Sequence, residues 1–129
     1  MRTTNIYAAT LFALSIMGAE IASAESLTSA QKNAVRSAKQ YLNMQGFSRD
    51  GLIEQLSSPY GDQYSVSDAT AAVDSLTVDW NEQASRSAKE YLGMMGFSCK
   101  GLIDQLSSDF GSKYTPSQAS YGASSAGAC

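Results

Sequence analysis

Two stretches of the chain decide the fold: RSAKQYLNMQGFSRDGLIEQLSS, residues Arg36–Ser58, and RSAKEYLGMMGFSCKGLIDQLSS, residues Arg86–Ser108. They align without a gap, and most aligned positions are identical. The similarity continues more weakly to Tyr64 in the first copy and Tyr114 in the second. A match of this length is far above chance, so the chain contains an internal duplication. The fold of one copy therefore determines the fold of most of the chain.

Each copy carries the start and stop signals of three helices. In the first copy, Thr28 and Gln31 form a capping box, which opens a helix, and Gly46 favours a helix end because it can take a positive φ. Ser48 and Ser65 are expected to cap a second and a third helix. Apolar residues recur at helical spacing in these segments: Ala30, Ala34, Ala38, Tyr41 and Leu42; Leu52, Ile53 and Leu56; Val66, Ala69, Ala72, Val73 and Leu76.

The second copy repeats this pattern. Asp79 and Glu82 mark the start of its first helix, whose inward stripe is expected to hold Trp80, Ala84, Ala88, Tyr91, Leu92 and Met95. Thr115–Gln118 is the clearest helix start in the chain, with a capping threonine and a proline at the first helical position. After Tyr121 the chain is almost entirely Gly, Ala and Ser. We therefore expect a short last helix and a flexible tail over residues 123–129.

A single copy is small for an independent domain, because about 45 residues bury little apolar surface. The segment from Leu76 to Trp80 contains neither proline nor glycine, so it does not resemble the linker between two independent beads. We predict an all-α fold: two tandem three-helix, helix-turn-helix-like repeats packed as one compact unit, with Trp80 at the junction. The predicted boundaries of the repeats are residues 25–77 and 78–122.

Residues 1–24 have the features of a secretory signal peptide. Arg2 supplies a basic start, and Ile6–Gly18 is an apolar stretch of about 13 residues, shorter than the roughly 20 that a membrane-spanning helix needs. Ala22-Ser23-Ala24 provides small residues for cleavage between Ala24 and Glu25. An uncleaved anchor and a buried helix are the less favoured alternatives. No cysteine for lipid attachment follows the apolar stretch, so we expect a soluble periplasmic or secreted chain without a stable membrane anchor.

The chain has two cysteines, Cys99 and Cys129. In an oxidising compartment an intramolecular disulfide is the default interpretation. It would tie the tail to the start of the second helix of copy two and stabilise the fold by roughly 3–4 kcal/mol. An intermolecular bridge through Cys129 and two free thiols are the alternatives. Arg49 occupies the matching position of copy one, so Cys99 is not part of the repeat itself.

Several kinds of chemistry have no residues to perform them. The sequence has no histidine, which removes the commonest general base and metal ligand, and no metal site, phosphate loop or cofactor motif is visible. Glu54 and Asp104 occupy matching positions, and such symmetry indicates solvated residues, since the two members of a catalytic carboxylate pair need different environments. The net charge is −3, which opposes binding to nucleic acid. We predict a binding protein rather than an enzyme.

The string YLxMxGFSxxGLIxQLSS, present at Tyr41–Ser58 and Tyr91–Ser108, resembles the Ltp family, the host cell surface-exposed lipoprotein domain. The resemblance covers residues 27–122 and includes Val78-Asp79-Trp80 between the copies. It implies a phage or prophage protein that causes superinfection exclusion. Such proteins permit adsorption of a second phage but block injection of its DNA by engaging the incoming tape-measure protein of the tail. Typical members are lipid-anchored, whereas this sequence lacks the lipidation cysteine.

A protein partner with a basic segment would suit an acidic surface. Positions identical in both copies are expected to build the core, so exposed acids are the better candidates for contacts: Asp50, Glu54, Asp62, Asp68, Asp74, Asp104 and Asp109. Charge reversal at Asp68 and Asp74 is a first probe. Two other functions remain open: an envelope module that binds the cell wall, and an inhibitor of a secreted or tail-associated lysozyme.

Overall fold

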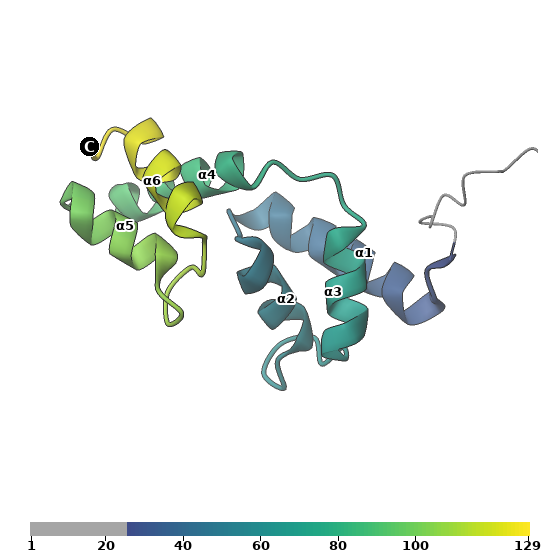
Figure 1. The fold of residues 1–129 in the computed structure, drawn as a ribbon. Coiled ribbons are helices and arrows are strands. Elements are labelled where there is room, and N and C mark those ends of the chain that lie inside the picture. Colours follow the sequence, from purple (N-terminus) through teal and green to yellow (C-terminus); the bar gives the residue numbers. More distant parts are fainter. Residues whose placement is uncertain (1–25) are drawn as a thin grey trace, which may run out of the picture.

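The computed structural model describes residues 26–129, which form six helices and no strand. The predicted signal peptide and its cleavage site at Ala24 and Glu25 lie outside the described residues. The helices are α1 (Ser29–Met44), α2 (Arg49–Ser57), α3 (Val66–Asp74), α4 (Trp80–Met94), α5 (Cys99–Ser107) and α6 (Pro116–Ser125). Figure 1 shows them as two three-helix groups joined by the segment between α3 and α4. The all-α prediction is confirmed.

The helices begin where the sequence places their caps. Thr28 forms a full capping box with Gln31 at the start of α1, and Thr115 forms the same box with Gln118 at the start of α6. Ser48 caps α2, and its side chain accepts a hydrogen bond from the backbone N–H of Gly51. Each cap satisfies a backbone donor that the first turn of a helix leaves without a partner. Local sequence therefore sets the helix starts.

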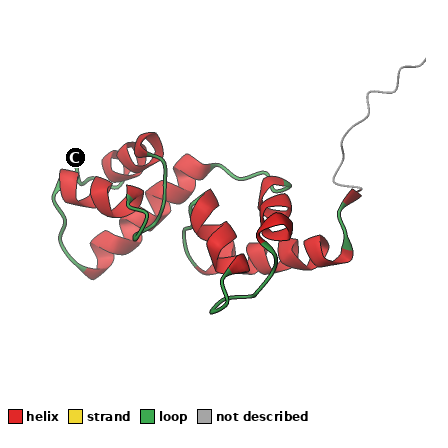
Figure 2. Cartoon of the chain, turned by 60° about the horizontal axis from the view of Figure 1, so that its bottom comes forward, coloured by secondary structure: helices red, strands yellow, loops and turns green. Residues whose placement is uncertain are grey.

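Each repeat has its own small apolar core. In the first, α3 packs on α1 and α2 around Leu52, Leu56 and Val73, which are fully buried. In the second, α6 packs on α4 and α5 around Leu102 and Leu106. The two groups of helices remain distinct in the rotated view of Figure 2. Both cores are filled by leucines at matching positions of the shared motif, so the motif has the same packing role in each repeat.

Trp80 connects the two cores. It is the first residue of α4, a helix of the second repeat, yet its side chain packs against the apolar cluster of the first. Further along the same helix, Ala84 and Ala88 are fully buried in the second cluster. The predicted junction at Trp80 is confirmed, and the repeats form one packed unit.

Three residues expected to point inward do not: Ala30, Val66 and Met95 are exposed. Ala30 and Val66 lie in the first turns of α1 and α3, before the buried stripes begin at Ala34 and Ala69. Met95 is the C-cap of α4 and has extended backbone, so the helical spacing no longer determines where its side chain points. The three predictions were wrong because the periodic pattern was carried to the helix ends, beyond the part of each helix that the core covers.

The expected flexible tail is also wrong in part. Helix α6 runs to Ser125, and Ala123 is fully buried rather than part of a loose tail. The small residues have a packing role: a Cβ on Gly122 would lie 2.6 Å from the carbonyl carbon and oxygen of Ala84. Because Gly122 has no side chain, α6 approaches the backbone of α4 closely. Gly, Ala and Ser at these positions indicate close helix packing here, not disorder.

Candidate functional site at the junction of the repeats

The turn between α1 and α2 docks on helix α4 of the second repeat. The backbone N–H of Gly46 donates to the carboxylate of Glu90 at 3.0 Å, and the N–H of Phe47 donates to the side-chain oxygen of Gln83 at 3.3 Å. A Cβ on Gly46 would lie 2.4 Å from Oγ of Ser87 and 2.8 Å from its backbone nitrogen. Gly46 has no positive φ. Its role is thus close approach between the repeats, not the left-handed helix end that the sequence suggested.

Arg86 holds the end of α1 against the same helix. Its guanidinium donates to the backbone carbonyls of Leu42 and Asn43, which lie in the last turn of α1. Its Nε also lies 3.3 Å from the carboxylate of Glu90. The last carbonyls of a helix carry partial negative charge, so a cation is favourable there. Arg86 thus binds the carbonyl end of α1, and Glu90 accepts a hydrogen bond from the N–H of Gly46 in the following turn.

A second set of contacts joins α2 to the loop between α5 and α6. The hydroxyl of Ser48 donates to the backbone carbonyl of Ser112. Nζ of Lys113 lies 2.7 Å from the carboxylate of Glu54, and this hydrogen bond raises the pKa of the lysine. These contacts are polar, in contrast to the apolar core of each repeat. They orient the two repeats by hydrogen bonding and charge.

A cleft of about 350 Å³ lies between the repeats, beside these contacts. Its walls include Gln45–Ser48 from the docking turn, Glu54 and Gln55 from α2, and Tyr91 from α4. Tyr60 and Ser112 lie at the two loops that border it. The lining is mainly polar and holds one carboxylate, Glu54, which is already paired with Lys113.

Two aromatic side chains project from the loops beside the cleft. Tyr60, between α2 and α3, and Phe110, between α5 and α6, are fully exposed. They occupy matching positions in the repeats, and both loops project toward the lower side of the molecule in Figure 1. Exposed aromatics of this kind are frequent contact residues in protein interfaces. Neither residue was among the contact candidates expected from the sequence, although an aromatic residue before a glycine in both turns was the available signal.

The acids of the first repeat mostly have partners within the chain. Arg49 pairs with Asp74, with its Nε at 2.7 Å from the carboxylate, and with Asp50 at 3.0 Å. The hydrogen bond from Arg49 holds the pKa of Asp74 below its usual value. Asp68 accepts from the side-chain amide of Gln31 at 3.1 Å, and Asp62 accepts from the hydroxyl of Tyr41 at 2.8 Å. Charge reversal at Asp68 or Asp74 would therefore disturb the fold as well as the surface.

The acids of the second repeat differ from one another. Asp104 lies 2.7 Å from Nζ of Lys100 on the same helix. Asp109 forms no hydrogen bond within residues 26–129, although its charge contributes to the raised pKa of Lys113, and it precedes the exposed Phe110. The seven candidate acids are thus spread over both repeats rather than gathered at one place. Asp109, beside Phe110, is the acid most available to a partner.

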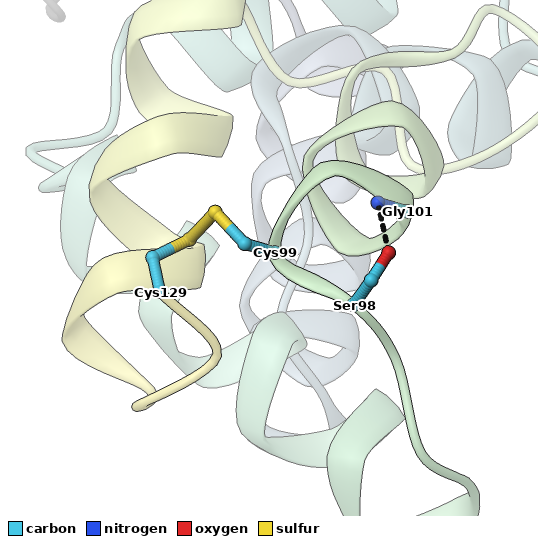
Figure 3. Close-up of a disulfide and its surroundings, with 4 residues drawn as sticks. All are labelled: Ser98, Cys99, Gly101 and Cys129. Carbon is cyan, nitrogen blue, oxygen red and sulfur yellow. Dashed lines mark hydrogen bonds between the residues drawn. A yellow bond between two sulfur atoms is a disulfide. The ribbon is translucent and has the colours of Figure 1, made fainter.

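A disulfide links Cys99, at the first turn of α5, to Cys129, at the end of the chain. Their Cα atoms are 4.7 Å apart, and the sulfurs 2.14 Å apart. Figure 3 shows the bond beside Ser98, which caps α5 through the backbone N–H of Gly101. The bond holds the segment after α6 against the start of α5, so it stabilises the second repeat far from the cleft.

Nothing in the described part of the chain resembles a metal centre, since no group of three or more Cys, Asp or Glu residues gathers there. None of the helices between residues 26 and 129 is both long enough and apolar enough to cross a membrane. The junction therefore offers hydrogen-bonding groups, exposed aromatics and one cleft. These are the components of a binding surface.

Comparison with known proteins gives two matches. The sequence pattern of a family described as host cell surface-exposed lipoprotein matches residues 29–76 and again residues 79–124. A solved structure of Ltp, a superinfection exclusion protein from the Streptococcus thermophilus temperate phage TP-J34, matches with a TM-score of 0.67 and 33% sequence identity. That match covers 75% of this chain and 95% of the other. No curated protein sequence matches.

Proposed function

Because the chain belongs to the host cell surface-exposed lipoprotein family, we propose that it is a superinfection-exclusion protein. In this proposal it is exported, and it blocks DNA injection by a second phage by binding an incoming tail component such as the tape-measure protein. The observation that carries the proposal is the 33% identity to a solved superinfection exclusion protein over 95% of that protein's chain. Both repeats take part in the match of the family pattern.

The loop side of the junction is the surface that we assign to the tail component. Tyr60 and Phe110 are already exposed, so a partner can bury them without unfolding either repeat. Aromatic side chains of this kind often dominate the energy of protein binding. Asp109 precedes Phe110 and is exposed, and its charge, which also acts on Lys113, suits a basic segment of the incoming protein.

The proposal is tested by expressing the full chain in a host that a panel of phages infects. We expect phage adsorption to be unchanged while DNA injection and plaque formation fall for at least one phage. Loss of adsorption, or normal DNA injection for every phage of a broad panel, would contradict exclusion at the injection step. A fall in lysozyme activity of purified tails, with DNA injection unaffected, would instead favour an enzyme inhibitor.

The assigned surface has its own test. Tyr60→Ala with Phe110→Ala removes both exposed rings and leaves the cores intact. Loss of two interface aromatics typically weakens binding by roughly 30-fold or more, so protection should be lost in a folded, exported variant. Tyr121→Ala is the matched control, because Tyr121 is a partly exposed aromatic on α6 instead of in a loop. Equal protection by the double variant and the control would remove the loops from the site.

A further inference from the structure

The second repeat carries a vacant copy of the turn that docks the repeats together. Gly96 and Phe97 match Gly46 and Phe47, but nothing lies within 4 Å of a Cβ placed on Gly96. The backbone N–H groups of Gly96 and Phe97 form no hydrogen bond in residues 26–129. In the first repeat the same two donors are bound by Glu90 and Gln83.

The carbonyl groups in the last turn of α4 also lack the partner that their counterparts in α1 have. The carbonyls of Leu42 and Asn43 accept hydrogen bonds from the guanidinium of Arg86, whereas no side chain within residues 26–129 donates to the matching carbonyls of Leu92 and Gly93. The matching region is also more apolar, since Met95 stands where the first repeat has Gln45, and both Met94 and Met95 are exposed. Methionine adapts well to the shape of a partner.

We infer that the turn at Gly96 and Phe97 is a docking site for an α-helix of a partner protein. The helix that fills the first copy defines the chemistry of this partner. The residue of the partner helix that faces the glycine is small, like Ser87. Four residues before it stands a side-chain amide, like Gln83, and three residues after it stands a carboxylate, like Glu90. An arginine directly before the small residue donates hydrogen bonds to the last carbonyls of α4, as Arg86 does to those of α1. This inference does not depend on the proposed phage function.

A second copy of this chain is a poorer occupant. Helix α1 is the counterpart of α4 and keeps Arg36 and Ser37, but Asn33 and Gln40 replace the glutamine and the glutamate. The carboxylate that accepts the glycine N–H is therefore missing. A charge-assisted hydrogen bond is roughly twice as strong as a neutral one. In addition, Ala30 stands where α4 has Trp80, the anchor of the internal junction.

The test uses a peptide copying residues 79–95, held helical by a staple between positions 81 and 85. These positions lie opposite to Gln83, Ser87 and Glu90 on the helix, so the staple leaves the docking face free. The peptide is added to the full mature chain labelled for NMR. We expect saturable shifts of the Gly96 and Phe97 amide signals, while those of Gly46 and Phe47 stay in place.

Two matched variants make the result specific. Gly96→Leu in the protein and Ser87→Leu in the peptide each fill the space of close approach, and each should weaken binding by about tenfold or more. Gly96→Leu should leave the melting temperature unchanged because its Cβ meets no atom. The absence of shifts at Gly96 and Phe97 overturns the inference. Shifts of these signals with protein concentration alone would also overturn it, because they assign the turn to a second copy of the chain.

Discussion

Gly46 and Gly96, which occupy matching positions in the two repeats, allow a sharp test of how the repeats pack. Gly46→Ala adds a Cβ that would lie 2.4 Å from Oγ of Ser87, 2.8 Å from its backbone nitrogen and 2.9 Å from the carbonyl oxygen of Gln83. Two of these atoms are backbone of α4, so they cannot rotate out of the way. Gly96→Ala introduces the same methyl group at the matching position, where no atom lies within 4 Å.

The expected difference in stability is large. Overpacking at Gly46 costs about 1–3 kcal/mol. Withdrawal of the turn also weakens the hydrogen bond from its N–H to Glu90, and such bonds to charged groups contribute about 1.5–3 kcal/mol. Because Glu90 is partly exposed, the lower end of the hydrogen-bond term applies, and the total loss of unfolding free energy is about 2.5–4.5 kcal/mol. Gly96→Ala should be neutral or stabilise by up to about 1 kcal/mol through the unfolded chain.

The measurement is thermal unfolding of the two mature variants, followed by far-UV circular dichroism with the disulfide intact. For a domain of this size, about 1 kcal/mol shifts the melting temperature by roughly 4–8 °C, so the variants should melt about 10–35 °C apart. Fluorescence of Trp80, which packs on the first core from α4, should report separation of the repeats in Gly46→Ala only. Equal melting temperatures would refute the close approach at Gly46.

Two further predictions concern the second repeat. Tyr114→Phe leaves the buried hydroxyl of Ser87 without its 2.7 Å partner and should destabilise by about 1–3 kcal/mol, whereas Tyr64→Phe removes a longer, more exposed bond and should have a smaller effect in the same urea titration. Burial raises the pKa of Tyr114; the unfolded chain therefore loses this proton first, and stability should fall above pH of about 10 by up to about 1.4 kcal/mol per pH unit from this group, and less steeply in Tyr114→Phe. Cys99→Ser with Cys129→Ser opens a disulfide between residues 30 apart in the sequence and should lower the unfolding free energy by roughly 3–4 kcal/mol. Reductant should lower the stability of the wild-type chain to that of the double variant and leave the variant unchanged; equal stability with and without the bond would contradict this prediction.

The fold was largely readable from local signals. Capping residues such as Thr28, Ser48 and Thr115 mark helix starts because they satisfy backbone donors within three residues. The spacing of Leu52 and Leu56 identifies the side of α2 that faces the core. Because the sequence is duplicated, the helices of the second repeat can then be predicted from those of the first. These features depend on contacts close in sequence, and for this reason they can be read without the structure.

The junction could not be read in the same way. Gly46 and Gly96 have the same local sequence, yet one touches Ser87 and the other touches nothing. The difference arises from a contact between residues far apart in the chain. Gly122 was misinterpreted for the same reason, since its close approach to Ala84 is tertiary. Likewise, the exposed acids could be listed from the sequence, but their pairing with Arg49, Lys100 and Lys113 depends on where side chains meet.

The most direct test of the central claim, that the chain acts by binding an incoming tail component, is to select phages that escape it. Phages that form plaques on cells expressing the full chain are isolated, and their genomes are sequenced. We predict that the substitutions gather in the gene of an internal tail component such as the tape-measure protein, and that purified escape protein binds the chain more weakly than the parental protein does. Escape substitutions confined to the receptor-binding protein or to a tail lysozyme would contradict the account.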